Sequence, residues 1–85
     1  MKVESDYKIH RLKILPKYLD AILRDEKRFE LRKDDRDFQV GDKLVLEEHD
    51  GSFYTGKQYG LLTIKYILRD CPEYGLAEGY CILGW

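Results

Sequence analysis

One segment of this 85-residue chain has helical spacing, whereas the other patterned segments alternate like strands. Leu19, Ile22 and Leu23 fall at i, i+3 and i+4 behind Pro16, which suits the first position of a helix, so we expect a helix over about 16–26. A helix this short is marginal alone and must bury its apolar stripe against a sheet. One helix among five or six short strands predicts an α+β fold, most simply a small curled sheet or barrel capped by the helix.

Alternation predicts a strand on each side of this helix. Before the helix, the apolar positions are Tyr7, Ile9, Leu12 and Ile14, and the change of parity after Ile9 suggests a β-bulge. After the helix, the run Arg-Phe-Glu-Leu-Arg alternates strictly, which is typical of a half-buried strand. In that run we expect the apolar pair to face the core and the charged residues to share the other face: Phe29 and Leu31 inward, and Arg28, Glu30 and Arg32 outward.

Turn signals and apolar runs assign the rest of the chain. We expect a strand over 43–47, a loop or irregular hairpin tip over 49–60, a strand over 61–69, a loop over 71–79 and a closing strand over 80–85. Phe38 and Val40 are expected in the core, and Gly41 and Asp42 in a tight turn. The parity of the strand over 61–69 places its alternate residues on one face: Leu62, Ile64, Tyr66 and Leu68.

Length and hydropathy indicate one soluble domain. Residues 1–6 are mostly polar and are expected to be disordered, which leaves a single domain over 7–85. No apolar run approaches the ~18 residues of a membrane span, and the first residues lack the apolar stretch of a signal peptide. We therefore expect a cytoplasmic monomer without membrane contact.

The cysteines and histidines give little support for a metal or redox site. Two cysteines are too few for a disulfide scaffold in a cytosolic chain, although one bridge stays open. A zinc site would have to gather Cys71, Cys81, His10 and His49, which show no C-x-x-C or H-x₃-H spacing. Neither histidine lies in a catalytic motif, and there is no G-x-S-x-G or glycine-rich phosphate loop. We therefore expect no metal and no cofactor.

Charge is balanced overall but segregated along the chain. Lys and Arg number 15 against 16 Asp and Glu, for a net charge of −1, which argues against a polycation that coats nucleic acid. Yet the blocks 8–36, 37–50, 57–69 and 70–85 carry +4, −4, +3 and −3. The fold can gather the basic blocks on one face, where interleaved tyrosines suit a nucleic-acid surface. The alternative is that these tyrosines simply fill a small core and its rim.

The most unusual stretch is KRFELRKDDR, residues 27–36, with five basic and three acidic side chains. One interpretation is a solvated strand face whose internal ion pairs contribute ~0–1 kcal/mol each. The other is a polar cluster at the mouth of a pocket beside the helix. There, arginine would bind a phosphate or a base edge, and Glu30 would orient it or accept from a ligand amine.

This stretch resembles the signature of the ASCH domains, a branch of the PUA-like superfamily, which reads G-x-K-x-x-E-x-R between the first helix and the next strand. Lys27, Glu30 and Arg32 match it, whereas Asp25 stands where glycine is usual. Further pieces match a small subgroup of uncharacterised bacterial and phage ASCH-like proteins. They are His10-x-Leu12-Lys13, the helix, Phe29 to Arg36, Val40-Gly41-Asp42, Tyr54-Thr55-Gly56 and Gly79-Tyr80-x-Ile82-Leu83, so the resemblance runs over about 8–85.

The resemblance implies a PUA-like β-barrel of five or six strands with one main helix beside the barrel opening. It also implies an RNA-associated role, with the charged signature in a cleft between helix and barrel. Some ASCH proteins, the acetylcytidine amidohydrolases, are similar in fold and place a lysine, a threonine and a glutamate in that cleft. Lys27 matches their lysine, but Glu30 falls where their threonine stands, so the residue for nucleophilic attack is missing.

The leading hypothesis is a non-catalytic module that binds RNA or a modified nucleotide. Its site would combine basic side chains for phosphate, a carboxylate that fixes an arginine or reads an amino group, and tyrosines that stack on bases. These residues are Lys13, Lys27, Glu30, Arg32, Arg36, Tyr54 and Tyr66.

Two further hypotheses stay open. In the first, Lys27 and Glu30 form the acid–base pair of a hydrolase that acts on an acylated or otherwise modified nucleoside, which requires both side chains to converge in a pocket of ~300 Å³ or more. In the second, the chain is a protein-interaction module whose contacts lie in the acidic block 37–50 and the segment 49–60.

Overall fold

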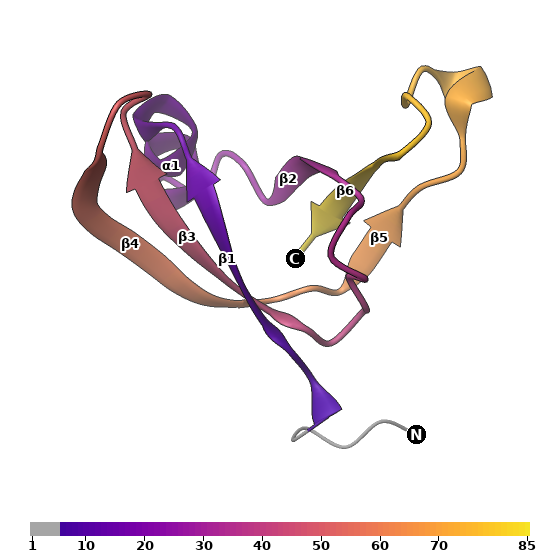
Figure 1. Cartoon of the computed structure of the whole chain (residues 1–85), viewed down its shortest axis with the longest axis horizontal. Coiled ribbons are helices and arrows are strands. Elements are labelled where there is room, and N and C mark those ends of the chain that lie inside the picture. Colours follow the sequence, from indigo (N-terminus) through magenta and orange to yellow (C-terminus); the bar gives the residue numbers. More distant parts are fainter. Residues whose placement is uncertain (1–5) are drawn as a thin grey trace.

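The structure is a computed structural model that describes residues 6–85, and these form six strands and one α-helix (Figure 1). Residues 1–5 of the segment expected to be disordered lie outside the described residues. The α+β class is confirmed. In chain order the elements are β1 (Ile9–Ile14), α1 (Pro16–Leu23), β2 (Phe29–Lys33), β3 (Lys43–His49), β4 (Tyr54–Thr63), β5 (Tyr66–Leu68), the short 3-10 helix η2 (Pro72–Tyr74) and β6 (Tyr80–Gly84).

The strands form two separate three-stranded sheets. Sheet A has the order β1-β3-β4, with β1 parallel to β3 and β3 antiparallel to β4. Sheet B has the order β2-β6-β5 and is antiparallel throughout. Figure 1 shows the two sheets side by side, with α1 beside β1 and β3. Both sheets are open, so the described strands do not form the closed barrel that the sequence suggested.

A single apolar core lies where α1 and the inner faces of both sheets meet. Its fully buried members come from β1, α1, β3, β6 and the connections between strands: Leu12, Leu19, Phe38, Leu44, Leu46, Ile64, Cys81 and Leu83. The helix ends three residues earlier than expected, at Leu23, and Leu23 of the expected apolar stripe is exposed. Val40 was expected in the core but is also exposed. Among the described residues, no helix has the length and hydrophobicity needed to cross a membrane.

The predicted bulge in the first strand is wrong, because β1 keeps an unbroken register with β3 from Ile9 to Ile14. The apparent change of parity arises because a polar residue, His10, occupies an inward position while Ile9 faces outward. The expected Gly41-Asp42 turn is confirmed. Gly41 has a φ of 98°, and the Tyr7 ring occupies the space that a Cβ atom would need.

The strand predicted over 61–69 is divided between the two sheets. The Ile64 N–H donates to Asp42 O next to sheet A, and the Lys65 N–H donates to Gly84 O in sheet B. Parity therefore changes at the crossing: Ile64 is buried, whereas Tyr66 and Leu68 face solvent, so these residues do not share the one face that was predicted.

The segment predicted as a loop or hairpin tip over 49–60 is mostly strand, since β4 begins at Tyr54 and pairs with β3. Only the tip is a turn. There the Asp50 carboxylate accepts the N–H groups of Ser52 and Phe53 at 2.8 Å each, and these bonds hold the pKa of that carboxyl below its usual value.

Candidate functional site

The turn between α1 and β2 brings the charged segment to its place. Asp25 has a φ of 59°, in the left-handed region that glycine adopts most easily and that aspartate tolerates better than most residues. Asp25 thus has a backbone conformation that glycine adopts most easily. The N–H groups of Glu26 and Lys27 both donate to Ala21 O, which directs the chain from the helix end into β2.

Residues of β2 face opposite to the prediction. Glu30 lies on the inner side and is only 6% exposed, whereas Phe29 and Leu31 face solvent at 46% and 56%. An inward carboxylate needs charged partners to offset the loss of water. Lys27 Nζ contacts Glu30 Oε1, and Arg32 Nη1 lies 3.7 Å from Glu30 Oε2, so a cation stands at each carboxylate oxygen. The structure therefore brings together Lys27, Glu30 and Arg32.

A pocket of about 330 Å³ opens beside this cluster. Its lining combines two aromatic rings, an aliphatic side chain and the ion pair: Tyr18, Lys27, Phe29, Glu30 and Leu31. Lys27 Nζ lies 5.3 Å from the centre of the Tyr18 ring and 4.9 Å from that of Phe29, within cation–π range. The pocket thus offers aromatic faces and a charged acceptor and donor in one small space.

The free edge of β2 adds backbone groups to the pocket. Trp85 N–H donates to Arg28 O, and Asp34 N–H donates to Gly79 O, so the even-numbered residues of this strand bond toward β6. In an antiparallel pair the odd-numbered residues then direct their N–H and C=O groups to the opposite edge. There, Lys27 Nζ donates to Phe29 O at 2.6 Å. The N–H and C=O of Leu31 face the same edge and can pair with the edge of a planar ligand.

Arg32 and Arg36 connect the charged segment to the outer edge of sheet A. Arg32 Nη1 donates to Lys13 O at 2.8 Å, and Arg36 Nη1 donates to Arg11 O at 2.7 Å. Both arginines therefore have a structural role, since they satisfy carbonyls of an edge strand. Each guanidinium has five N–H donors, so these single bonds leave others for a ligand.

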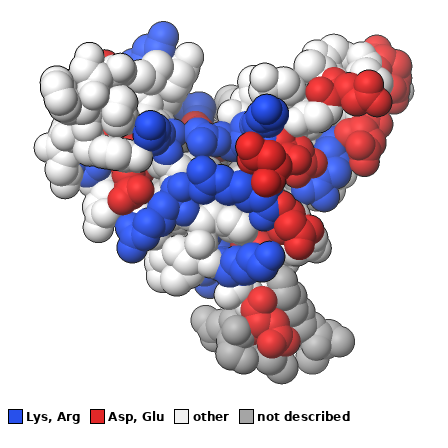
Figure 2. All heavy atoms as spheres, viewed as in Figure 1, with Lys and Arg blue, Asp and Glu red and all other residues white. Residues whose placement is uncertain are grey.

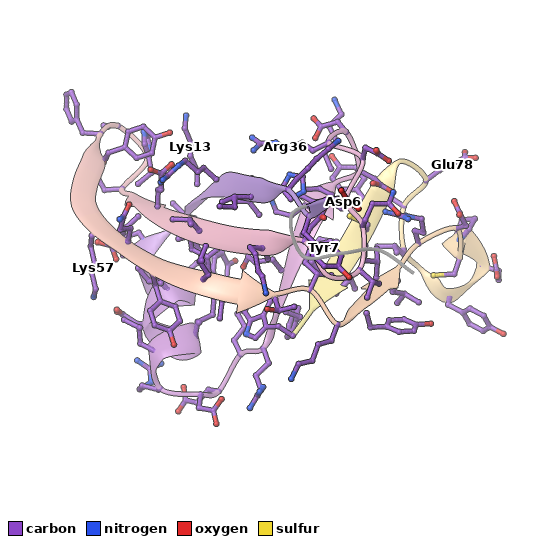
Figure 3. All side chains as sticks on the ribbon, turned by 90° about the horizontal axis from the view of Figure 1, so that it is seen from below. Asp6, Tyr7, Lys13, Arg36, Lys57 and Glu78 are labelled. Carbon is purple, nitrogen blue, oxygen red and sulfur yellow. The ribbon has the colours of Figure 1, made fainter. Side chains whose placement is uncertain are left out.

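The basic side chains form a band across one face of the molecule, with acidic side chains gathered at one end of it (Figure 2). Lys13 and Arg36 point to the same side, as seen from a perpendicular direction in Figure 3. Lys13 Nζ also lies 5.6 Å from the centre of the Tyr54 ring, which joins two predicted site residues on the outer face of sheet A. This band is consistent with the segregation of charge along the sequence.

Tyr66 does not join these groups. It lies on β5, an edge of sheet B, with its side chain 67% exposed. The predicted set is therefore divided into three parts: the Lys27–Glu30–Arg32 cluster, the Lys13–Tyr54 contact, and Tyr66 apart. Arg36, in the connection between β2 and β3, bonds to β1 beside the second part. Sequence reasoning also missed Tyr18 as a pocket residue. Its position one turn before the buried Ile22, beside the buried stripe of the helix, was the available signal.

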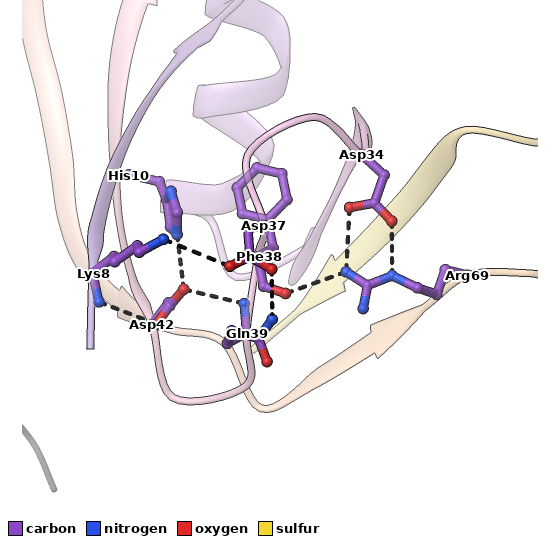
Figure 4. A network of polar contacts seen from close by, with 8 residues as sticks. All are labelled: Lys8, His10, Asp34, Asp37, Phe38, Gln39, Asp42 and Arg69. Carbon is purple, nitrogen blue, oxygen red and sulfur yellow. Dashed lines mark hydrogen bonds and ion pairs between the residues drawn. The ribbon is translucent and has the colours of Figure 1, made fainter. Parts of the chain in front are cut away.

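A second polar network supports the fold rather than the pocket (Figure 4). Asp42 is fully buried and accepts from Lys8 N–H and Gln39 N–H at 3.1 Å each, and it pairs with His10 Nε2 at 2.8 Å. His10 is thus a buried residue with its polar group satisfied.

The same network includes a bidentate pair between Arg69 and Asp34, with distances of 2.7 and 3.2 Å. This pair ties β5 to the turn after β2. Burial raises the pKa of the neighbouring Cys81 thiol, and the Asp34 carboxylate raises it further. Both cysteines are free, and no group of three His, Cys, Asp or Glu suited to a metal occurs in the described part of the chain.

Comparison with known proteins places the chain in a family. The model of the family described as a domain of unknown function, DUF3850, matches residues 9–85. The chain belongs to this family. It is also similar to an uncharacterised 12.9 kDa protein encoded 3′ of GpA in Escherichia phage P2, with 43% identity over 51 residues. That match covers 60% of the chain but 47% of the phage protein, so the DUF3850 chain spans about half of its relative.

Proposed function

We propose that this DUF3850 chain binds single-stranded RNA or a modified nucleotide and receives a nucleobase in the pocket between α1 and β2. The observation that carries the proposal is the inward Glu30 carboxylate, paired with Lys27, in a pocket that the Tyr18 and Phe29 rings also line. Aromatic rings stack on any base, and a carboxylate accepts from an exocyclic amino group. The volume of about 330 Å³ falls at the lower end of small-ligand pockets.

The basic band supplies the contacts to phosphate. Lys13, Arg32 and Arg36 bring three cations to the outer edge of β1. Contacts of this kind bind without reading sequence and weaken with salt, because each releases condensed counterions. In this proposal the pocket binds the base and the basic band binds the phosphates. A local band of cations is compatible with a chain whose net charge is only −1.

The same proposal includes a relationship to the ASCH domains. It is supported by the Lys27–Glu30–Arg32 spacing and by the glycine-like backbone of Asp25 at the signature position. We propose that the two open sheets are a variant of the PUA-like barrel, with the charged signature beside the helix as in that superfamily.

Fluorescence anisotropy with a labelled single-stranded RNA of roughly ten nucleotides tests the function. Tyr18→Ala removes one pocket face and should weaken binding about fivefold or more, while Tyr74→Ala, at an 87% exposed position on η2, serves as the matched control. Lys13→Ala should lower the slope of log K against log salt by about 0.7. Unchanged affinity in Tyr18→Ala, or no binding by the native chain, contradicts the proposal.

A second candidate function is favoured by one observation, the convergence of Lys27 and Glu30 in the pocket. In this hydrolase, Glu30 takes a proton from water while the water oxygen attacks an acyl carbon of the modified nucleoside, and Lys27 donates to the oxyanion. The C–N bond then breaks, and the proton passes from Glu30 to the leaving amine. A chromatographic assay of acetylcytidine hydrolysis tests this second function. Turnover by the native chain that is lost in Glu30→Gln supports the hydrolase, whereas no turnover by the native chain refutes it.

A further inference from the structure

The outer face of sheet B, turned away from the core, is apolar and largely exposed. β2, β6 and β5 contribute six large side chains to it: Phe29, Leu31, Tyr66, Leu68, Tyr80 and Ile82. A contiguous apolar patch of this kind on a small domain marks an interaction surface. Among the described residues that these strands place on the face, the single charged side chain is that of Lys33, so the patch is apolar with a cationic end.

One row across this face has a distinctive composition. Gly84 pairs with Phe29 on one side and with Tyr66 on the other, so the three residues lie in line across the sheet. Residues in such a row point to the same face. The two aromatic side chains therefore flank a residue without a side chain, and their backbones stand about two strand spacings, or ~9.6 Å, apart.

Backbone geometry does not require glycine at this position. Gly84 is absent from the glycines with positive φ, and a Cβ atom placed on it would meet only Tyr66 O at 3.6 Å, an ordinary van der Waals contact. Glycine inside a strand weakens the strand, because it has no side chain to pack and loses more entropy on folding. Its effect here is to leave the space between the two rings open.

We infer that the row Phe29–Gly84–Tyr66 is a stacking slot for a second nucleobase of a bound single strand. This inference rests on the proposed function and extends it. A planar ring held between two others occupies about 7–8 Å, which is two contacts of about 3.5–4.0 Å, so the slot accommodates one base. Phe29 also lines the pocket, so the slot and the pocket are adjacent and consecutive nucleotides can occupy them.

The chemistry of the face favours a nucleic-acid strand over a second copy of the chain. Aromatic rings at separated positions of an open sheet are a recurring platform for unstacked bases. Lys33 lies on the same face, next to Tyr80, and its exposed side chain can contact a phosphate. Lys27 is already paired with Glu30, and its Nζ lies 4.9 Å from the centre of the Phe29 ring. Two copies facing each other would bring the Lys33 side chains of both onto an apolar surface, at a cost in desolvation.

The test measures binding of two probes by the full chain, one RNA oligomer with bases and one abasic oligomer of equal length. Tyr66→Ala and Gly84→Val remove one wall of the slot or fill it, and both leave the lining of the pocket unchanged. We expect each to weaken binding of the base-bearing oligomer about fivefold or more, with no change for the abasic oligomer. Gly84→Ala should have a smaller effect in the same direction, and Tyr74→Ala should have none.

The outcomes separate the slot from the pocket. If Tyr66→Ala and Gly84→Val bind RNA as tightly as the native chain while Tyr18→Ala binds weakly, the slot is refuted and the pocket stands. Failure of the native chain to bind either oligomer overturns both. Sedimentation equilibrium completes the test: a native dimer that Tyr66→Ala converts to monomer assigns the face to a second copy and overturns the inference.

Discussion

The ion pair between Lys27 and Glu30 should be strongly coupled in the free energy of unfolding. Lys27→Met removes the ammonium but keeps an unbranched apolar side chain, and it leaves the Glu30 carboxylate with Arg32 at 3.7 Å as its remaining charged partner. Glu30→Gln removes the negative charge with little change in shape. The double variant loses both charges and so avoids an uncompensated carboxylate.

The magnitude follows from the exposure of the two side chains, 14% for Lys27 and 8% for Glu30. Exposed pairs contribute ~0–1 kcal/mol, whereas removal of one partner from a fully buried pair costs about 3–5 kcal/mol. This pair lies between those limits and close to the second, so Lys27→Met should destabilise the fold by about 2–3 kcal/mol. The double variant should recover about 1–2 kcal/mol of that loss.

Urea unfolding followed by Trp85 fluorescence gives the four free energies of the double-mutant cycle. Trp85 is the chain's single tryptophan and packs against the core, so its emission reports global unfolding. Arg24→Met is the matched control, because its ion pair with Glu26 is exposed and should contribute less than ~1 kcal/mol. Additivity of Lys27→Met and Glu30→Gln within about 0.5 kcal/mol would refute the claim of an inward, charge-compensated carboxylate.

Three further perturbations have definite expected results. Gly84→Ala should stabilise the fold by about 0.5–1 kcal/mol in urea unfolding, because its Cβ meets only ordinary contacts; destabilisation would contradict the open space. Asp42→Ala should lower the free energy of unfolding by about 3 kcal/mol in thermal unfolding, because His10 and two backbone N–H groups lose their hydrogen-bond partner. A loss below 1 kcal/mol would refute this. The Cys81 pKa is raised in the fold, so the unfolded thiol ionises first, and stability should fall as pH rises above ~8.5. Cys81→Ala should show a shallower fall, and equal slopes would contradict the shift.

The alternation of apolar and charged residues predicted the strand β2 correctly, but the prediction of which β2 residues face the core was wrong. Alternation shows that neighbouring residues point in opposite directions, and the prediction then assumed that apolar residues face the core. Here Lys27 and Arg32 offset the burial of Glu30, so Phe29 and Leu31 are left to solvent. The sequence shows Lys27 three positions before Glu30, and Arg32 on the same face of the strand. That both cations reach the Glu30 carboxylate depends on the turn at Asp25.

Other differences have tertiary causes. Residues 61–69 have uniform strand propensity, and the division at Ile64 and Lys65 arises because their N–H groups bond to different sheets. The glycines and polar residues of 49–60 suggested a turn, yet pairing with β3 extends β4 back to Tyr54. The class, the short helix behind Pro16 and the closing strand were predicted correctly, since each depends on local pattern.

The central claim is that a base enters the pocket between α1 and β2. The most direct measurement is a titration of isotope-labelled chain with a short single-stranded RNA, monitored by NMR at the amides and side chains of the pocket. We predict saturable chemical-shift changes at Tyr18, Lys27, Phe29 and Glu30, weaker ones along the basic band, and none at Tyr74. Changes confined to the basic band, with the pocket signals unmoved at saturation, would contradict the account.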